Sequence, residues 1–381
     1  MRVYFDNAAT TPLDPEVFEA MKPFMLNVHG NPSSTHSHGR EVRAAIEKAR
    51  KTVAELLHAT PGEIFFTSGG TEADNTALCG TIEGNGVQHV ISSPMEHHAV
   101  LHTLQHLHDT GRVQLHMAQF DAQGCLDYGH LEKWLAEHPN ALVSLMHGNN
   151  EIGNLIDLNR VANLAKEYKG FFHSDTVQTM AHYRHNLKET PADAVVGAGH
   201  KFHGPKGSGF LFLRKGHKCA PYIYGGSQER NMRGGTENVY GIVGIAKAME
   251  IAYADMEAHQ QHIQGLKTRM IEQLKERLPG VAFNGTAETP EESLYTVCNV
   301  SLPPSETAGM MLFSLDLAEI SASGGSACSS GSQLGSHVLR SLNHDPQRPA
   351  VRFSFSKYNT AEEVDYVVNK LVEIYQPVAA V

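Results

Sequence analysis

The chain has 381 residues, of which 41% are hydrophobic and 19% are charged, and its formal net charge is −10. A chain of this length usually exceeds what one hydrophobic core organises, so we expect two domains. The acidic balance and the lack of a basic run argue against nucleic acid or an anionic membrane as the main partner.

The N-terminal segment and the cysteines bear on the cellular compartment. The segment MRVYFDNAATTP has neither the basic head nor the apolar stretch of a signal peptide, and no window is apolar enough for a membrane span. The five cysteines are scattered without CxxC spacing, which disfavours structural zinc and a disulfide framework. We therefore predict a protein of the reducing cytoplasm.

Short apolar runs alternate with helical patterns over residues 14–254. We expect buried strands over residues 63–70, 89–94, 141–147, 170–175, 194–200 and 209–215, with helices such as residues 158–170 between them. This alternation predicts an α/β fold whose mostly parallel sheet is covered on both faces.

A long helical pattern over residues 244–280 is interpreted as a bridge to a second domain. That domain has fewer strand signals, at residues 293–303 and 350–356, and ends in a helix for which Thr360 and Glu363 form a capping box. We place a large domain at residues 12–256 and a smaller α+β domain at residues 257–381, which residues 1–11 join.

The first chemical motif is EIFFTSGGTEADN, a strand followed by a glycine-rich turn and a helix start. Backbone N–H groups at a helix start favour an anion, and glycine lets a phosphate approach closely. Gly70 and Thr71 are the expected contacts. Many such turns hold no ligand, so this motif alone is weak.

The second motif, FFHSDTVQT, places Asp175 just past a buried strand, where open parallel sheets bind ligands. A carboxylate there can hold a cation, a metal or a protonated ring nitrogen. Taken alone, the commoner role of such an aspartate is a helix N-cap.

The third motif, AVVGAGHKFHGPKGSGFLFL, places Lys201 between a strand and a glycine-rich stretch, next to His200. An enclosed lysine has a lowered pKa, and its neutral amine can form a Schiff base. Lys206 is a local competitor, and a surface loop lysine is the ordinary alternative. Together the three motifs supply what pyridoxal phosphate needs: a phosphate cradle, an acid for the ring nitrogen and a lysine.

These motifs carry a resemblance to a known family. TSGGTEADN, EHHAV, MHGNNEIG, HSDTVQ, GHKFHGPKG, QERNMRGGTENV, SGGSACSSGS and VRFSFS occur in the order found in cysteine desulfurases. The chain resembles the group with the longer active-site loop, of the nitrogen-fixation and iron–sulfur-cluster type, in the class-V aminotransferase family. The resemblance spans nearly the whole chain and implies the fold-type-I architecture, pyridoxal 5'-phosphate and a homodimer.

The resemblance also implies roles for individual residues. His97 resembles the imidazole that stacks on the cofactor ring and shuttles protons. Asn150 and Gln178 resemble the contacts of the ring oxygen, and Asn150 also that of the substrate carboxylate. Thr236 resembles a phosphate contact from the neighbouring subunit, and Arg352 a carboxylate clamp.

Cys328 lies in ISASGGSACSSGSQLGS, where glycine and serine on both sides predict a flexible loop rather than core. Burial as a small apolar residue is the ordinary fate of a cysteine, and it suits Cys298 and perhaps Cys79. It does not suit Cys328, which the resemblance implies is the persulfide-forming residue.

Two departures from the family pattern affect the expectations. Ala198 stands where many relatives have a serine that bonds the phosphate, which puts one phosphate contact in question although His200 and Lys201 remain. The chain also ends soon after KLVEIYQPVAAV, whereas relatives that dock an iron–sulfur scaffold often have a longer tail. Scaffold docking is therefore less firmly indicated than desulfuration.

A stripe of histidines has a spacing that can bind a divalent metal ion. His98, His102 and His106 are spaced for one helix face, but no cysteine joins them and the nearest carboxylate, Asp109, lies at the far end. A solvated helix face is the better interpretation, and we predict no metal site.

The predicted function is conversion of L-cysteine to L-alanine, with sulfur passed through Cys328 to an acceptor for iron–sulfur cluster or thio-cofactor synthesis. The acceptor is a cluster scaffold, a thiolation protein or another carrier. The alternatives are a selenocysteine lyase, which uses similar residues, and another pyridoxal-phosphate aminotransferase, which has no need of a loop thiol.

Overall fold

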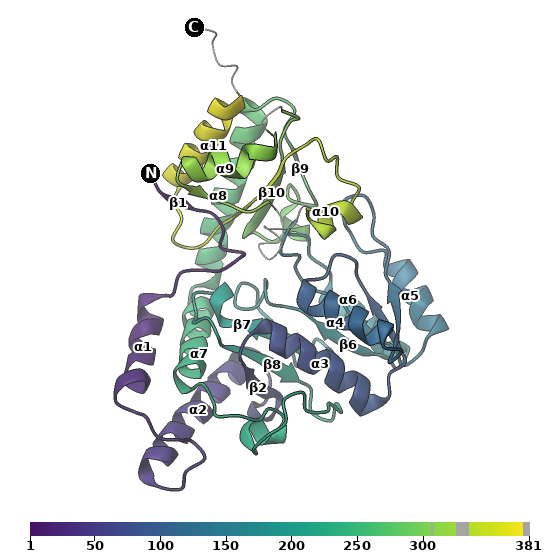
Figure 1. Cartoon of the computed structure of the whole chain (residues 1–381), viewed down its shortest axis with the longest axis vertical. Coiled ribbons are helices and arrows are strands. Elements are labelled where there is room, and N and C mark those ends of the chain that lie inside the picture. Colours follow the sequence, from purple (N-terminus) through teal and green to yellow (C-terminus); the bar gives the residue numbers. More distant parts are fainter. Residues whose placement is uncertain (306–307, 325–334, 376–381) are drawn as a thin grey trace.

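The computed structural model describes residues 1–305, 308–324 and 335–375 of the chain (Figure 1). Within these residues the strands form three sheets, of seven, three and two strands. In Figure 1 the seven-stranded sheet and its helices occupy the lower part of the molecule. The two small sheets lie in the upper part with α8 (Met256–Arg277), α9 (Met311–Leu317) and α11 (Ala361–Tyr375).

The large sheet has the order β2-β8-β7-β6-β5-β3-β4. Strand β8 runs antiparallel to both of its neighbours, and the remaining pairs are parallel, so the predicted mostly parallel sheet is confirmed. Its strands are β2 (Ile64–Thr67), β3 (His89–Ser92), β4 (Gln114–Met117), β5 (Leu142–Ser144), β6 (Phe171–Ser174), β7 (Ala194–Ala198) and β8 (Gly209–Leu213).

Helices cover both faces of this sheet because its side chains alternate between two apolar layers. Val90 of β3 packs with α3 (Gly70–Asn85) and α4 (His98–Asp109) on one face. Its neighbour Ile91 belongs to the core on the other face, and each such fully buried side chain contributes about 1.5–3 kcal/mol to folding. That second layer contains α1 (Pro15–Leu26), α2 (Ser37–Leu56), α5 (Tyr128–Glu137), α6 (Leu158–Glu167) and α7 (Val239–Ala254).

A separate core cluster joins the N-terminal strand to the later part of the chain. Val3 and Phe5 pack with residues of α8 (Met256–Arg277), α11 (Ala361–Tyr375), β10 (Val297–Ser301) and β12 (Ala350–Ser354). Strand β1 (Val3–Tyr4) pairs in parallel with β11 (Ile320–Ser321), and the side chain of Asn7 donates to Ser354 O at 2.9 Å. The other elements here are β9 (Ala282–Phe283), α9 (Met311–Leu317) and α10 (His337–Ser341).

Most sequence-based elements are found in place, with two corrections. The helical pattern over residues 244–280 is not one helix. Helical geometry is interrupted at Asp255, between α7 and α8, and the second helix ends at Arg277. Strand β4 was not predicted, since its four letters QLHM include no β-branched residue and only two apolar ones. The predicted capping box is confirmed: Glu363 N–H donates to Thr360 Oγ1 at 3.3 Å, and Thr360 N–H to Glu363 Oε2 at 3.0 Å.

No helix among the described residues is both long enough and apolar enough to cross a membrane. This agrees with the hydropathy of the sequence.

Candidate active site

One cavity of about 240 Å³ gathers most of the residues that the sequence singled out. It opens beyond the carboxyl ends of the large sheet, since its residues directly follow β2, β3, β5, β6 and β7. Arg352 of β12 lines the same cavity, so the two parts of the molecule meet there. The predicted residues that line it are Gly70, Thr71, His97, Asn150, Asp175, Gln178, His200, Lys201 and Arg352.

Lys201 lies in a single 3-10 turn, Gly199–Lys201, directly after β7. Its Nζ donates to Ala8 O at 2.7 Å and to Ala9 O at 2.8 Å, so the N-terminal segment holds the amine at the cavity. The neighbouring His200 ring contacts Thr10 Oγ1 at 3.1 Å. The competing Lys206 is exposed and does not line the cavity.

Asp175 is a buried carboxyl, 5% exposed, whose Oδ1 accepts from Val177 N–H at 2.9 Å. Burial raises the pKa of Asp175, whereas the charges of His97 and Lys201 and the hydrogen bond from Val177 lower it. A cation placed against this carboxyl therefore gains a strongly favourable partner that water screens little.

His97 caps the start of α4, with its Nδ1 accepting from Ala99 N–H at 3.1 Å. Burial lowers the pKa of His97 and the charge of Lys201 lowers it further, while Asp175 acts in the opposite direction. The neutral ring, with Nδ1 as the acceptor, carries its proton on Nε2. His97 is thus a neutral imidazole that can give or take a proton at Nε2.

The start of α3 is arranged for an anion. Gly69 precedes this sixteen-residue helix and provides no side-chain cap, so within the described part of the chain the N–H groups of its first turn are not capped by an N-cap side chain. A Cβ added at Gly70 would lie 2.8 Å from Val177 Cγ2, so glycine is required for the close packing at this turn. Thr71 adds a hydroxyl at the same place, and Ala198 lines the same cavity without one.

Arg352 is 1% exposed and reaches the cavity from the small sheet. Its guanidinium donates to Asn150 O and to Asp6 Oδ1, each at 2.8 Å. Its Nε is buried and has no acceptor among the described residues. Gln178 Nε2 donates to Ala8 O at 3.0 Å, the same carbonyl that accepts from Lys201.

Two predicted site residues are not brought into this cavity. Thr236 lines a different pocket, of about 100 Å³, together with Ser68, Arg233 and Asn238. Its predicted contact is with the neighbouring subunit's cofactor, and a single chain does not test that contact. Cys328 lies outside the described residues.

Sequence reasoning missed a buried acid that lines the cavity. Asp74 is 1% exposed and lies 3.3 Å from the ring of His173, without hydrogen-bond geometry. Burial raises the pKa of Asp74 well above its usual value, with repulsion from Asp175 and Glu96 adding to the effect, and burial lowers the pKa of His173 to about 3. Burial therefore disfavours the charged form of both groups. The signal was present, because Asp74 follows Gly70 by one helical turn and faces the same way.

Ala8 and Ala9 were also missed as part of the site. Their contribution is two backbone carbonyls, and a carbonyl leaves no residue-type signal in a sequence.

The histidine stripe of α4 does not gather ligand atoms for a metal ion. His98 and His102 stack ring on ring, with centroids 4.5 Å apart, and His337 packs beside His98 at 4.7 Å. Among the described residues, the three-residue group with suitably close ligand atoms lies elsewhere, on β3, β4 and the end of α5.

Comparison with known proteins gives consistent matches along the chain. The family model for aminotransferase class-V matches residues 3–367. A protein named cysteine desulfurase IscS from Dictyoglomus turgidum is 41% identical over 378 residues, covering 98% of this chain and 94% of that protein. One of the same name from Methanosarcina thermophila is 40% identical and covers 98% and 92%.

The solved structures agree with these matches. A structure described as a NifS-like protein is 37% identical, with a TM-score of 0.89 and coverage of 98% of this chain and 99% of that one. A NifS-like protein from Rickettsia africae is 30% identical, with a TM-score of 0.87 and coverage of 98% and 99%.

Proposed function

This chain belongs to the aminotransferase class-V family and to the cysteine desulfurases within it, and from that premise we propose that it passes the sulfur of L-cysteine through Cys328 to an acceptor. The observation that carries the proposal is the convergence of Lys201, Asp175, His97 and Arg352 on one cavity. These four residues come from distant parts of the chain and from both parts of the molecule.

The residues of the cavity fit pyridoxal phosphate, the cofactor of this family. Lys201 offers an amine, Asp175 a buried carboxyl for a ring nitrogen, and the start of α3 at Gly70 and Thr71 an uncapped helix end for a phosphate. When bound, the cofactor supplies an electron sink that makes the Cα proton of an amino acid removable. Asp175 stabilises the positive charge on the ring nitrogen, on which that sink depends.

Proton transfer falls to Lys201 and His97. The lysine amine is held by the carbonyls of Ala8 and Ala9, so it stays at the cavity when it is not bonded to the cofactor. In the proposal Lys201 removes the Cα proton, and His97 carries protons through Nε2. Its lowered pKa keeps the ring neutral, so it is ready to accept a proton near pH 7.

Substrate orientation is assigned to Arg352 and Asn150. The guanidinium is fixed by Asp6 and by Asn150 O, and its planar two-pronged shape suits the carboxylate of the amino acid. The Asn150 side chain lines the same cavity. Lys201 lines the cavity as well, so an amino acid held there by its carboxylate shares the cavity with the lysine amine.

Sulfur transfer is assigned to the thiol of Cys328. The thiolate attacks the substrate sulfur, an S–S bond forms as the Cβ–S bond breaks, and the electron pair of that bond stays with the substrate carbon. That carbon takes up a proton and becomes the methyl group of alanine. L-cysteine and the thiol thus give L-alanine and a persulfide without an outside oxidant or reductant.

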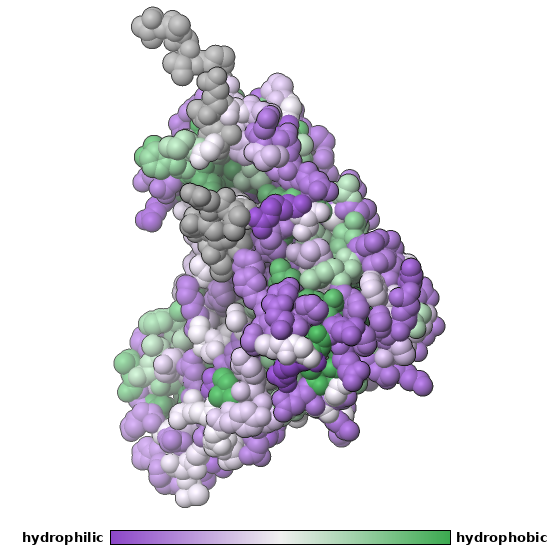
Figure 2. Space-filling model, turned by 45° about the vertical axis from the view of Figure 1, so that its right-hand side comes forward, coloured by the Kyte–Doolittle hydropathy of each residue, from purple (hydrophilic) through white to green (hydrophobic). Residues whose placement is uncertain are grey.

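A homodimer is part of the proposal and has two supports. Thr236 is expected to contact the cofactor of the neighbouring subunit, which requires a second chain. The surface of α1 is apolar, with Phe18, Met25 and Leu26 exposed by 43%, 50% and 70%, and Figure 2 shows apolar surface gathered at the lower left, where α1 lies in Figure 1. Exposed apolar patches of this kind mark interfaces.

The acceptor, the compartment and the domain limits complete the proposal. A cluster scaffold or a thiolation protein would receive the persulfide sulfur, for iron–sulfur cluster or thio-cofactor synthesis. The reducing cytoplasm suits a chain whose described cysteines, Cys79, Cys125, Cys219 and Cys298, are all free thiols. The separate core clusters of the two parts support a large domain at residues 12–256 and a small one at 257–381, joined by residues 1–11.

The test exchanges Cys328 for serine and follows two steps separately. Cys328→Ser should keep the cofactor absorbance and Cα proton exchange of cysteine, but form no persulfide and release almost no sulfide. Cys125→Ser is the matched control and should turn over as the unchanged enzyme does. Mass spectrometry after one turnover should find one added sulfur on the peptide containing Cys328. Sulfur on another cysteine, or full sulfide release by Cys328→Ser, would overturn the proposal.

A second test locates the cofactor lysine. Borohydride reduction followed by peptide mapping should label Lys201, and Lys201→Ala should lose nearly all turnover while Lys206→Ala keeps it. A label on Lys206 would contradict the assignment.

The enzyme alternatives differ in substrate and in the need for a thiol. A selenocysteine lyase would release selenide from selenocysteine far faster than sulfide from cysteine. Another aminotransferase would be insensitive to Cys328→Ser. Rates on the two substrates, with and without Cys328, separate these cases from desulfuration.

A further inference from the structure

Three histidines gather at the edge of the large sheet, outside the cavity described above. His89 begins β3, His116 lies in the edge strand β4, and His138 follows directly after α5. The strand register pairs Ile91 with His116, so His89 and His116 point to the same face of the sheet, the one that α5 covers. Chain positions 27 and 22 residues apart thus meet in space.

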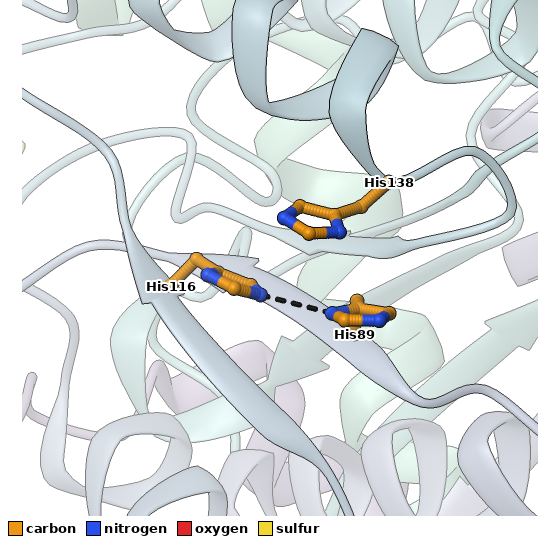
Figure 3. A group of neighbouring side chains, drawn as sticks. All are labelled: His89, His116 and His138. Atoms are coloured by element: carbon orange, nitrogen blue, oxygen red, sulfur yellow. Dashed lines mark hydrogen bonds between the residues drawn. The ribbon is translucent and has the colours of Figure 1, made fainter.

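The ring nitrogens of these histidines lie close together. Figure 3 shows His89 and His116 with their nitrogens facing one another, and His138 lying over them. His89 Nδ1 and His116 Nε2 are 3.0 Å apart, and one nitrogen from each of the three rings lies within 4.8 Å of the other two. Nitrogens bound to one tetrahedral zinc ion at about 2.0–2.1 Å are separated by about 3.3–3.4 Å. A small adjustment therefore gives three ligands to one ion.

The contact between His89 and His116 is itself informative. Two neutral imidazole nitrogens that face each other at 3.0 Å must share a single proton, and the same two lone pairs can share a metal ion instead. The three rings also stack, with centroids of His89 and His138 4.1 Å apart and those of His116 and His138 4.5 Å apart. Stacked rings do not aim their lone pairs at one point, so His138 has to turn, which a partly exposed side chain does rapidly.

The chemistry of the ligands selects the ion. All three are imidazoles and none is a carboxylate, which suits zinc, copper or nickel and not magnesium or calcium. The neutral imidazole, with a lone pair on one ring nitrogen, is the form that binds such an ion. Each side chain is partly exposed, so water can supply a fourth ligand.

We propose that His89, His116 and His138 form a binding site for one divalent transition-metal ion, with Zn²⁺ as the expected occupant. The ion would tie the edge strand β4 to β3 and to the end of α5. It would stabilise the folded chain by mass action, because the unfolded chain does not bring these residues together. None of the three histidines lines the cavity that contains Lys201, so the proposal does not depend on desulfuration.

Trp134 supplies a direct reporter of this site. It is the single tryptophan of the chain, it lies in α5, and its ring is 4.3 Å from that of His116 and 5.3 Å from that of His138. A paramagnetic ion bound by these histidines would quench its fluorescence at short range.

The experiment titrates the cofactor-loaded enzyme with Ni²⁺, following tryptophan fluorescence, and with Zn²⁺ against a chromophoric chelator. The unchanged enzyme should show saturable quenching and should bind one equivalent of zinc. In His116→Gln and His138→Gln the affinity of this site for the metal ion should fall at least about tenfold, so that both signals are lost at the same metal concentration. His102→Gln, a histidine of α4 outside the group, is the matched control and should retain both signals. Zinc should raise the melting temperature of the unchanged enzyme and not that of the two variants.

Cofactor absorbance and metal-free melting report whether each variant is folded, and His89→Gln provides a third substitution if one is not. Equal quenching and equal zinc stoichiometry in the unchanged enzyme and in these variants would overturn the site. The same variants are expected to release sulfide at an unaltered rate. A failure of the metal-site proposal can therefore be distinguished from a failure of the proposed activity.

Discussion

Two histidines lie on either side of β3, His89 at its first residue and His97 beyond its last, at the N-cap of α4, and their surroundings differ. His89 begins the strand and lies partly exposed against two other imidazoles, whereas His97 follows its carboxyl end and lies in the cavity beside Asp175 and Lys201. Burial lowers the pKa of both, but His138 adds to the effect at His89, and Asp175 opposes it at His97. A lowered pKa alone therefore does not identify a catalytic residue.

The difference teaches that the neighbours of an imidazole decide what it can do. At the carboxyl end of the sheet, a carboxyl, a lysine and an uncapped helix surround the ring and suit proton transfer. At the edge, further imidazoles surround it and suit a metal ion. The following predictions test this distinction, from the largest expected effect to the smallest.

The largest effect should come from Asp175→Asn, which keeps the shape of the side chain and removes its charge. If the carboxylate stabilises the ring nitrogen of the cofactor, exchange of the Cα proton of cysteine should slow by about a hundredfold or more. Deuterium incorporation from D₂O, followed by NMR at constant bound cofactor, measures this.

Asp157→Asn is the matched control, because Asp157 is an ordinary N-cap whose Oδ1 accepts from Arg160 N–H at 3.0 Å. It should exchange at the original rate. An unchanged rate in Asp175→Asn as well would mean that Asp175 too serves merely as a cap for Val177 N–H.

The next effect compares these two histidines directly. His97→Ala should slow Cα proton exchange by about 10²–10⁴-fold, the usual contribution of a positioned acid or base. His89→Ala should leave the rate unaltered, since its ring lies outside the cavity. Equal effects of the two substitutions would contradict the assignment of His97, and not His89, to the active site.

A third prediction uses a buried lysine away from both histidine sites. Lys267 of α8 is fully buried, and burial lowers its pKa to about 8 from 10.5, although Ser293 Oγ and Leu294 O accept from it. The folded protein thus carries this charge at a cost of about 3 kcal/mol below pH 8. That cost disappears as the pH rises toward 10.5, where the unfolded chain also loses the proton.

The free energy of unfolding should therefore rise, relative to Lys267→Met, by about 2–3 kcal/mol between pH 7 and pH 10. Urea unfolding at the two pH values measures it. Lys275→Met, an exposed lysine of the same helix, controls for general alkaline effects. A pH-independent difference would show that burial does not depress the pKa of Lys267.

The smallest effect is local and involves no titrating group. Thr360→Ala removes the hydroxyl that caps α11 and should lower the free energy of unfolding by about 1 kcal/mol. A change in melting temperature of a few degrees or less, with unaltered Cα proton exchange, is the expected result. A loss of activity would mean that α11 influences the cavity.

The sequence predicted the elements and residues whose signals are local. Strand letters such as AVVGA and GFLFL placed β7 and β8, and the residues that follow the strands indicated Asp175 and Lys201. The parallel sheet then brings these residues together, because carboxyl ends of parallel strands share one edge. The resemblance to a known family added His97, Asn150 and Arg352, whose motifs carry no such local logic.

What the sequence could not show depends on contacts across the fold. The carbonyls of Ala8 and Ala9 hold Lys201 from 193 and 192 positions away. The edge histidines come from two strands and a helix end, and their meeting depends on the register of β3 with β4, a strand that was not predicted at all. The interruption between α7 and α8 at Asp255 could not be predicted, because no glycine or proline lies beside it.

The pairing of the N-terminal segment with the late strands has a consequence for biosynthesis. Asn7 donates to Ser354, 347 positions later, and Val3 pairs with Ile320, so a ribosome releases the segment around Ala8 long before its partners exist. Until those partners emerge, the carbonyls that hold Lys201 have no fixed place, and contacts of such long separation form slowly. The contacts that hold the Lys201 amine are therefore completed only after the last strands of the chain have been synthesised, later than the strands of the large sheet.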